Sequence, residues 1–152
     1  MATGNVLADL AILFLAAFGA ATILPFQSEV VFAALQASDA HSIWALLIVA
    51  SVGNTLGSVV NYLMGLWIEH FRHRRWFPVS EAGLDRSQRW FARWGVWSLL
   101  LSWAPFADGL TVVAGVMRTP FWLFLLLVAV AKTGRYAILA GLVGGAGRAI
   151  GG

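Results

Sequence analysis

Two long apolar stretches of this sequence are each broken by a proline that an acidic residue closely follows. In residues 5–37 the pair is Pro25 and Glu29, and in residues 95–117 it is Pro105 and Asp108. A helix that crosses a bilayer needs about 20 consecutive apolar residues, and the breaks leave no half of that length. Because a proline and a carboxylate at that depth must be satisfied by protein or water, each stretch is predicted to be a broken or re-entrant helical hairpin.

Two further stretches, residues 42–69 and 120–143, are long enough to span a membrane as continuous helices. The first begins at a plausible N-cap, Ser42, and carries the polar strings 53–55 and 61–62. Small and polar residues in such a helix are expected to face protein or water, since lipid cannot satisfy them. The glycine-rich end after Val143 is expected to fray.

The composition places this unit in a membrane. Hydrophobic residues make up 60% of the chain and charged residues 11%, against about 45–50% and about 25% in soluble domains. The sequence therefore predicts a single membrane domain over residues 1–152, all-α and polytopic. Cysteine is absent and the three histidines show no ligand spacing, so no disulfide, metal or cofactor is expected.

Six of the ten lysines and arginines fall in one segment, residues 70–94, where arginines alternate with tryptophan and phenylalanine. This pattern predicts a basic amphipathic helix at the membrane surface, on the cytoplasmic side by the positive-inside rule. Such a local patch does not indicate nucleic-acid binding.

The order of elements repeats: a broken segment is followed by a span in each half, with Tyr62 and Tyr136 in corresponding places. If residues 70–94 are cytoplasmic, the two halves have opposite orientation, so we predict a weak inverted repeat. In transporters of that architecture, discontinuous helices meet near the midplane and present backbone groups to the substrate. The alternative is that any two hydrophobic hairpins resemble each other.

Four charged residues fall within the apolar segments: Glu29, Asp108, Lys132 and Arg135. Each costs about 2.5–3.5 kcal/mol on insertion scales, so pairing or function must compensate. Glu29 and Asp108 are candidates to bind protons, because a low dielectric favours a neutral carboxyl group. The alternative is that both are ion-paired with Arg135 and Lys132.

Other polar residues are candidates for substrate contact. Lys132 and Arg135 share a helix face that suits one anionic target, with the Tyr136 hydroxyl nearby. Arg118 could hold a lipid phosphate or simply anchor a helix at the interface. Asn54 and Asn61 are two helical turns apart and lie on one stripe, either at the site or as packing contacts.

No catalytic site is expected. The sequence lacks a Gly-x-Ser-x-Gly motif and a phosphate-binding glycine loop, and its one close histidine pair, His70 and His73, lies among arginines and is interpreted as part of the basic surface segment. A membrane-embedded lipid enzyme is therefore the weakest of the function classes considered.

Several separated strings, in order along nearly the whole chain, resemble the short YqaA-type branch of the DedA (VTT, SNARE-associated) membrane proteins. They are residues 21–25 (ATILP), 28–31 (SEVV), 53–57 (GNTLG), 102–105 (SWAP), 108–110 (DGL), 114–118 (AGVMR) and 132–136 (KTGRY). The resemblance implies two re-entrant hairpins with associated spans. It also implies transport of lipids such as undecaprenyl phosphate or phosphatidylethanolamine between leaflets, using the proton gradient and membrane-embedded acids and arginines.

By position, Glu29 fits the acid of the family's first hairpin, and Asp108 and Arg118 fall in the second hairpin motif. The arginine pair that larger relatives carry around the second proline is not reproduced beside Pro105, which leaves the substrate open. We predict a protein of the bacterial inner membrane whose partners are lipid phosphates and protons, with monomer and homo-oligomer as alternatives. The alternative function is a non-transporting scaffold for envelope integrity or a partner complex.

Overall fold

A computed structural model describes residues 5–22, 27–67, 81–103 and 109–151, and every regular element in these ranges is a helix. In chain order the elements are α1 (Val6–Thr22), α2 (Gln27–Ala37), α3 (Ile43–Leu66), α5 (Glu81–Trp94), the 3-10 helix η1 (Gly95–Trp103), α6 (Gly109–Val116) and α7 (Phe121–Gly151). The predicted all-α class is confirmed. Pro25, Pro105 and Asp108 lie outside the described residues, in intervals that separate α1 from α2 and η1 from α6.

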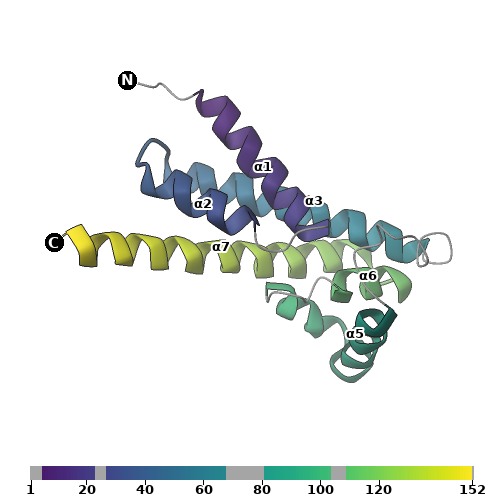
Figure 1. Ribbon diagram of the computed structural model, residues 1–152. Coiled ribbons are helices and arrows are strands. Elements are labelled where there is room, and N and C mark those ends of the chain that lie inside the picture. Colours follow the sequence, from purple (N-terminus) through teal and green to yellow (C-terminus); the bar gives the residue numbers. More distant parts are fainter. Residues whose placement is uncertain (1–4, 23–26, 68–80, 104–108, 152) are drawn as a thin grey trace.

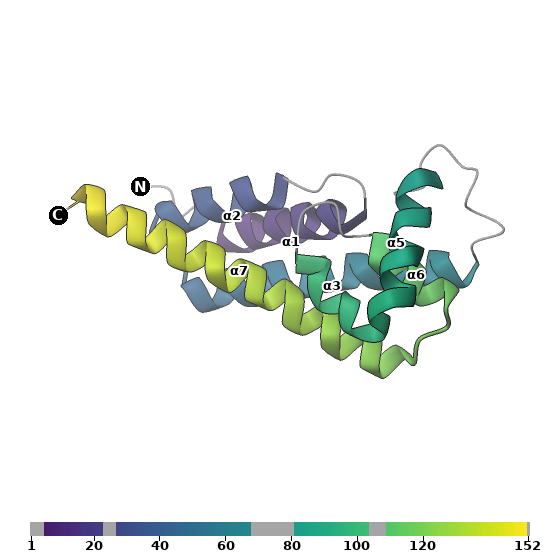
Figure 2. The same ribbon diagram turned by 90° about the horizontal axis from the view of Figure 1, so that it is seen from below.

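The two longest helices, α3 and α7, run lengthwise through the molecule in opposite directions (Figure 1). The pair α1 and α2 opens toward the end of the molecule where both termini lie. The pair η1 and α6 opens toward the opposite end, where α5 projects from the body (Figure 2). The two broken segments thus enter the helical body from opposite ends.

Only α3 and α7 have the length and hydropathy to cross a membrane, among the helices described. Their 24 and 31 residues correspond to about 36 Å and about 46 Å, against about 30 Å for a hydrocarbon core. The other apolar helices are shorter, with 17 residues in α1, 11 in α2 and 8 in α6. These lengths agree with the prediction of two full spans.

The molecule differs from a soluble protein in its apolar outer surface and in the polar side chains among its buried residues. Large apolar side chains on several helices are exposed, whereas the interior holds buried polar ones. The exposed apolar side chains include Leu7, Leu15, Val30, Trp44, Trp122 and Leu126, and the most buried polar ones are Ser28, Asn54, Ser58, Asn61, Ser98, Ser102, Thr111 and Lys132. A water-soluble fold would leave that apolar surface in contact with water, whereas a bilayer covers it with lipid.

Glycines allow α3 to approach its neighbours closely. A Cβ atom at Gly53 or Gly57 would lie 2.7 Å or 2.6 Å from a backbone carbonyl oxygen of α1. Near the other end of α3, Gly65 lies against Gly115 of α6 so closely that a Cβ on either would overlap the backbone of the other helix. As expected from the sequence, the small residues of this span face protein.

The expectation that the chain frays after Val143 is wrong, because α7 continues to Gly151. Glycine lowers helix propensity, yet backbone N–H groups in apolar surroundings find partners only within a helix. The end of α2 is bonded to α7 just before this glycine-rich part: the Gln36 Nε2 atom donates a hydrogen bond of 2.9 Å to the carbonyl of Ala140.

The aromatic residues of the basic segment do not all face outward. Phe91 of α5 is buried in a cluster with Leu99 of η1 and Phe124 of α7, while Trp90 and Trp94 stay exposed. Phe91 therefore anchors α5 to the body, and the sequence pattern alone did not separate it from the exposed rings.

We predict that Gly65→Ala destabilises the protein by about 1–3 kcal/mol, the usual cost of overpacking a tight contact. The reason is that the new methyl group would meet the carbonyl oxygen of Val112, a backbone atom that cannot move aside. Thermal unfolding of the purified protein in detergent measures the effect. The matched control is Gly141→Ala in α7, where nothing lies within 4 Å and alanine should be neutral or slightly stabilising. Equal melting temperatures for the two variants would contradict the packing described.

Candidate functional site

An ion pair joins the first broken segment to the second span. Glu29, in the first turn of α2, accepts a hydrogen bond from the Arg135 guanidinium in the middle of α7. Their side chains are 28% and 11% exposed. Because both side chains are largely shielded from solvent, each charge stabilises the other, and the N-terminal end of α2 further favours the carboxylate.

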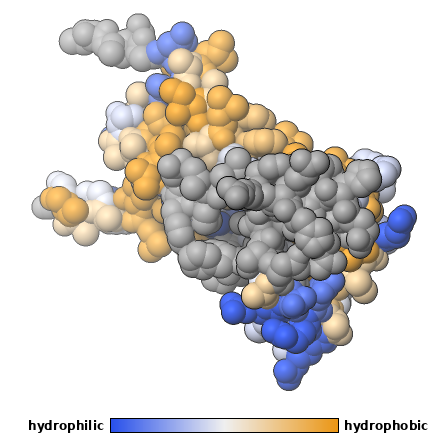
Figure 3. All heavy atoms as spheres, turned by 45° about the vertical axis from the view of Figure 1, so that its right-hand side comes forward, coloured by the Kyte–Doolittle hydropathy of each residue, from blue (hydrophilic) through white to orange (hydrophobic). Residues whose placement is uncertain are grey.

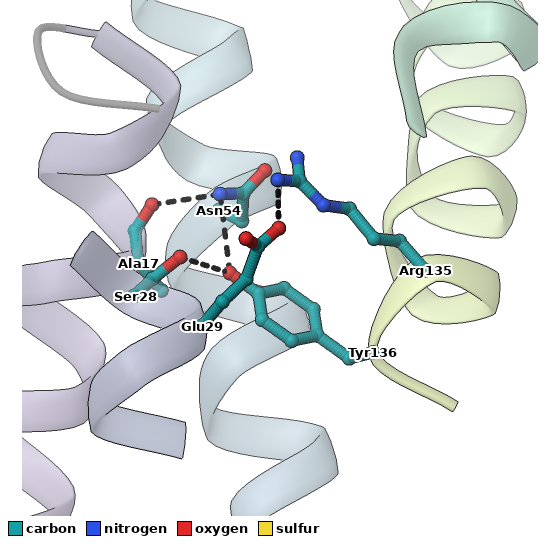
Figure 4. Close-up of polar contacts among 6 residues, drawn as sticks. All are labelled: Ala17, Ser28, Glu29, Asn54, Arg135 and Tyr136. Carbon is teal, nitrogen blue, oxygen red and sulfur yellow. Dashed lines mark hydrogen bonds and ion pairs between the residues drawn. The ribbon is translucent and has the colours of Figure 1, made fainter. Parts of the chain in front are cut away.

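A chain of hydrogen bonds lies beside this pair (Figure 4). The Tyr136 hydroxyl donates to Ser28 Oγ at 2.9 Å and accepts from Asn54 Nδ2 at 3.3 Å. The same Asn54 amide donates to the carbonyl of Ala17 at 2.9 Å. One buried tyrosine thus links α7 to α2 and α3, and Asn54 extends the network to α1.

Asn61 makes the corresponding connections two helical turns further along the same face of α3. Its Nδ2 atom donates to the carbonyl of Ala21 at 2.8 Å and to Thr111 Oγ1 of α6 at 3.1 Å. Ala21 is in the last turn of α1, where carbonyl groups lack partners within the helix. Asn61 therefore caps the end of one broken segment and contacts the other.

Both asparagines keep one unused acceptor. Neither Asn54 Oδ1 nor Asn61 Oδ1 has a hydrogen-bond partner among the described residues, although both side chains are buried. A buried polar atom without a partner is rare and costly. These two oxygens can accept a hydrogen bond from a water molecule or from another proton donor that enters the interior.

The inward face of α7 carries positive charge as well as the Tyr136 hydroxyl. Lys132 is fully buried, one helical turn before Tyr136. Together with Arg135 it places two cationic side chains three residues apart, toward the middle of a span. An anion that reached this depth would meet both of them.

The predicted site residues are only partly brought together. The Glu29–Arg135 pair and the Asn54–Tyr136 hydrogen bond lie side by side, and the structure does not describe Asp108. Arg118 is exposed, at the turn that closes α6, with a φ of 52°. Its N–H donates to the carbonyl of Gly115, and the next N–H donates to that of Ala114, which is a Schellman motif. Arg118 thus belongs to the end of the molecule rather than to the buried group.

Sequence reasoning missed Ser28 and Thr111, which bond to Tyr136 and Asn61. The available signal for Ser28 was its place next to Glu29 in an apolar stretch. It also missed a pair at the other end of the molecule, where His41 lies 3.0 Å from the Asp9 carboxylate and ties α1 to the loop before α3.

The structure is that of a helical membrane protein in which the pairs α1–α2 and η1–α6 pack with two long apolar helices around buried polar side chains. The profile of the VTT domain matches residues 13–144, a range that includes α2, α3, α5, η1 and α6 with most of α1 and α7. The chain therefore belongs to the VTT domain (DedA) family, as its motifs suggested, and is an integral membrane protein.

Among its relatives, the inner membrane protein YqaA of Escherichia coli (strain K12) is 34% identical over 131 residues, which are 84% of this chain and 86% of YqaA. An uncharacterized protein of Haemophilus influenzae is 33% identical over 139 residues, 86% of this chain and 85% of that protein. Undecaprenyl phosphate transporter A of Staphylococcus aureus is 29% identical over 106 residues, covering 63% of this chain and 52% of the transporter. No solved structure matches.

A double-mutant cycle tests the central ion pair. Glu29→Gln and Arg135→Gln should each destabilise the fold, since each removes one of the two charges that meet in this contact. The double variant should be more stable than the sum of the two losses predicts, with a coupling energy of about 0.5–3 kcal/mol. Chemical or thermal unfolding in detergent measures all four proteins. Additive losses would mean that the two side chains do not interact in the folded protein.

Proposed function

We propose that this protein carries an anionic lipid phosphate, either an anionic phospholipid or a polyprenyl phosphate, between the leaflets of the inner membrane, and that the transfer is coupled to protons. The observation that carries the proposal is the Glu29–Arg135 pair, which joins a broken helix to a span inside the apolar body. The transporter name of the Staphylococcus aureus relative supports a lipid phosphate as the substrate class.

In this proposal, α1–α2 and η1–α6 are re-entrant hairpins that dip into the bilayer from opposite faces, as halves of an inverted repeat. Their opposite openings in Figure 1 support this arrangement. The contacts of α3 with both support it too, since Asn61 bonds to α1 and α6 at once. In such an architecture the substrate site lies where the broken segments meet.

Coupling follows from competition for one guanidinium. When Glu29 binds a proton it loses its charge, and its hold on Arg135 weakens. A lipid phosphate then takes the place of the carboxylate, since guanidinium binds both groups through the same pair of N–H donors. Loss of the proton restores the ion pair and displaces the phosphate. Lys132, buried on the same face of α7, adds attraction for the phosphate, and Asp108 is the proposed second acid.

The second candidate is a scaffold that moves nothing. The observation in its favour is that Glu29 and Arg135 stabilise each other in the structure, so that the charges have a structural role without any substrate. The two functions differ in what happens when both charges are removed together.

Reconstitution into liposomes with a leaflet-specific lipid phosphate probe separates them. We expect wild-type protein to transfer the probe faster under a proton gradient, and Glu29→Gln to abolish that dependence. The double variant Glu29→Gln/Arg135→Gln should fold and yet transfer nothing, because it has neither the titrating group nor the anion-binding group. The control is Asp39→Asn, an exposed acid with φ of 53°, a conformation that asparagine tolerates. Full transfer by the double variant would refute the mechanism, and no transfer by wild type would favour the scaffold.

A further inference from the structure

The outer face of α5 presents three arginines and two tryptophans that the proposed transport mechanism does not use. Arg86, Arg89 and Arg93 are exposed, and Trp90 and Trp94 are 46% and 53% exposed. Spacings of three and four residues place all five on one face of the helix. Figure 3 shows hydrophilic residues gathered at the end of the molecule where α5 projects.

The side chains on this face of α5 form a concave surface. Its five residues line an open hollow of about 460 Å³. The guanidinium of Arg93 lies over the Trp94 ring, 5.4 Å from the ring centroid. Phe91, buried among the residues of η1 and α7, fixes the rotation of α5 so that the hollow faces away from the body.

The charge of the hollow selects an anion. Among the residues that the structure describes, the three charged side chains that line it are cationic, and the nearest acid on this helix, Asp85, is exposed beside Arg86 without lining the hollow. From Arg86 to Arg93 the helix advances by about 10 Å. Three cationic side chains exceed the single negative charge of one phosphodiester, so two linked phosphates match the charge and length of the hollow better than one.

We propose that this hollow binds the headgroup of a phospholipid that carries two phosphates, at the membrane surface. Tryptophan rings settle at the level of lipid headgroups, and arginine forms paired N–H contacts with phosphate, so the two residue types suit the same place and ligand. Trp67, the residue directly after α3, is also exposed. It lies where this predicted span would leave the hydrocarbon core. This site is separate from the Glu29–Arg135 pair and does not depend on whether the protein transports lipid.

Native mass spectrometry of the full-length protein in detergent, with equimolar cardiolipin, phosphatidylglycerol and phosphatidylcholine, tests the proposal. Wild-type protein should retain cardiolipin in preference to the other two lipids. Each of Arg86→Gln, Arg89→Gln and Arg93→Gln should weaken cardiolipin binding by about fivefold, and the triple variant by about a hundredfold. High salt should weaken the wild-type preference in the same direction.

The matched control is Arg148→Gln, which removes one exposed arginine near the end of α7 and should leave cardiolipin binding unchanged. Circular dichroism verifies that the variants keep their helices, and if the triple variant does not fold, the three single variants decide. An unchanged preference in the arginine variants, or an equal loss in Arg148→Gln, would overturn the proposal. So would competition by inorganic pyrophosphate at the same concentration as the lipid, or a change in oligomeric mass in place of bound lipid.

Discussion

The fold depends on satisfying the backbone of helices that end inside an apolar body. Lipid offers no hydrogen bonds, so a carbonyl at the end of a broken helix must find a partner within the protein. In α1 this is done by side chains: Asn61 donates to the carbonyl of Ala21, and Thr22 Oγ1 donates to that of Gly19 at 3.1 Å. A continuous span needs no such partners. Helix α3 thus supplies a hydrogen-bond donor to a carbonyl group at the C-terminal end of α1.

The same requirement explains the unusual composition of α3. Gly53 and Gly57 bring its backbone close to α1, and only at that distance can Asn54 and Asn61 reach the carbonyl groups of α1. Larger residues in place of the glycines would separate the helices and leave the amides without partners. Close packing and polar satisfaction therefore act on one stripe of one helix, and they place the buried polar group that the candidate site uses.

Much of this could be predicted from the sequence, because the period and polarity of a single segment reveal which face is inward. The polar string of α3, the two spans and the interruptions of the apolar stretches are all local patterns. Partners are not local: 106 residues separate Glu29 from Arg135 and 108 separate Ser28 from Tyr136. No pattern within one helix shows which charge meets which. The inward turn of Phe91 and the helical C-terminal end also depend on neighbouring helices, so propensity and composition missed them.

A buried ion pair is weak evidence of stability alone, since apolar residues of similar size often serve a fold equally well. Burying Arg135 and Glu29 thus costs desolvation free energy that leucine residues at the same positions would not. That cost has a purpose if the pair must open. In the structure the Glu29–Arg135 contact lies next to the hydrogen bond between Tyr136 and Asn54, and the pair is stable while both side chains carry their charges. In the proposed transport mechanism the opening of this pair is the reason for its cost, whereas a scaffold could carry apolar residues at both positions.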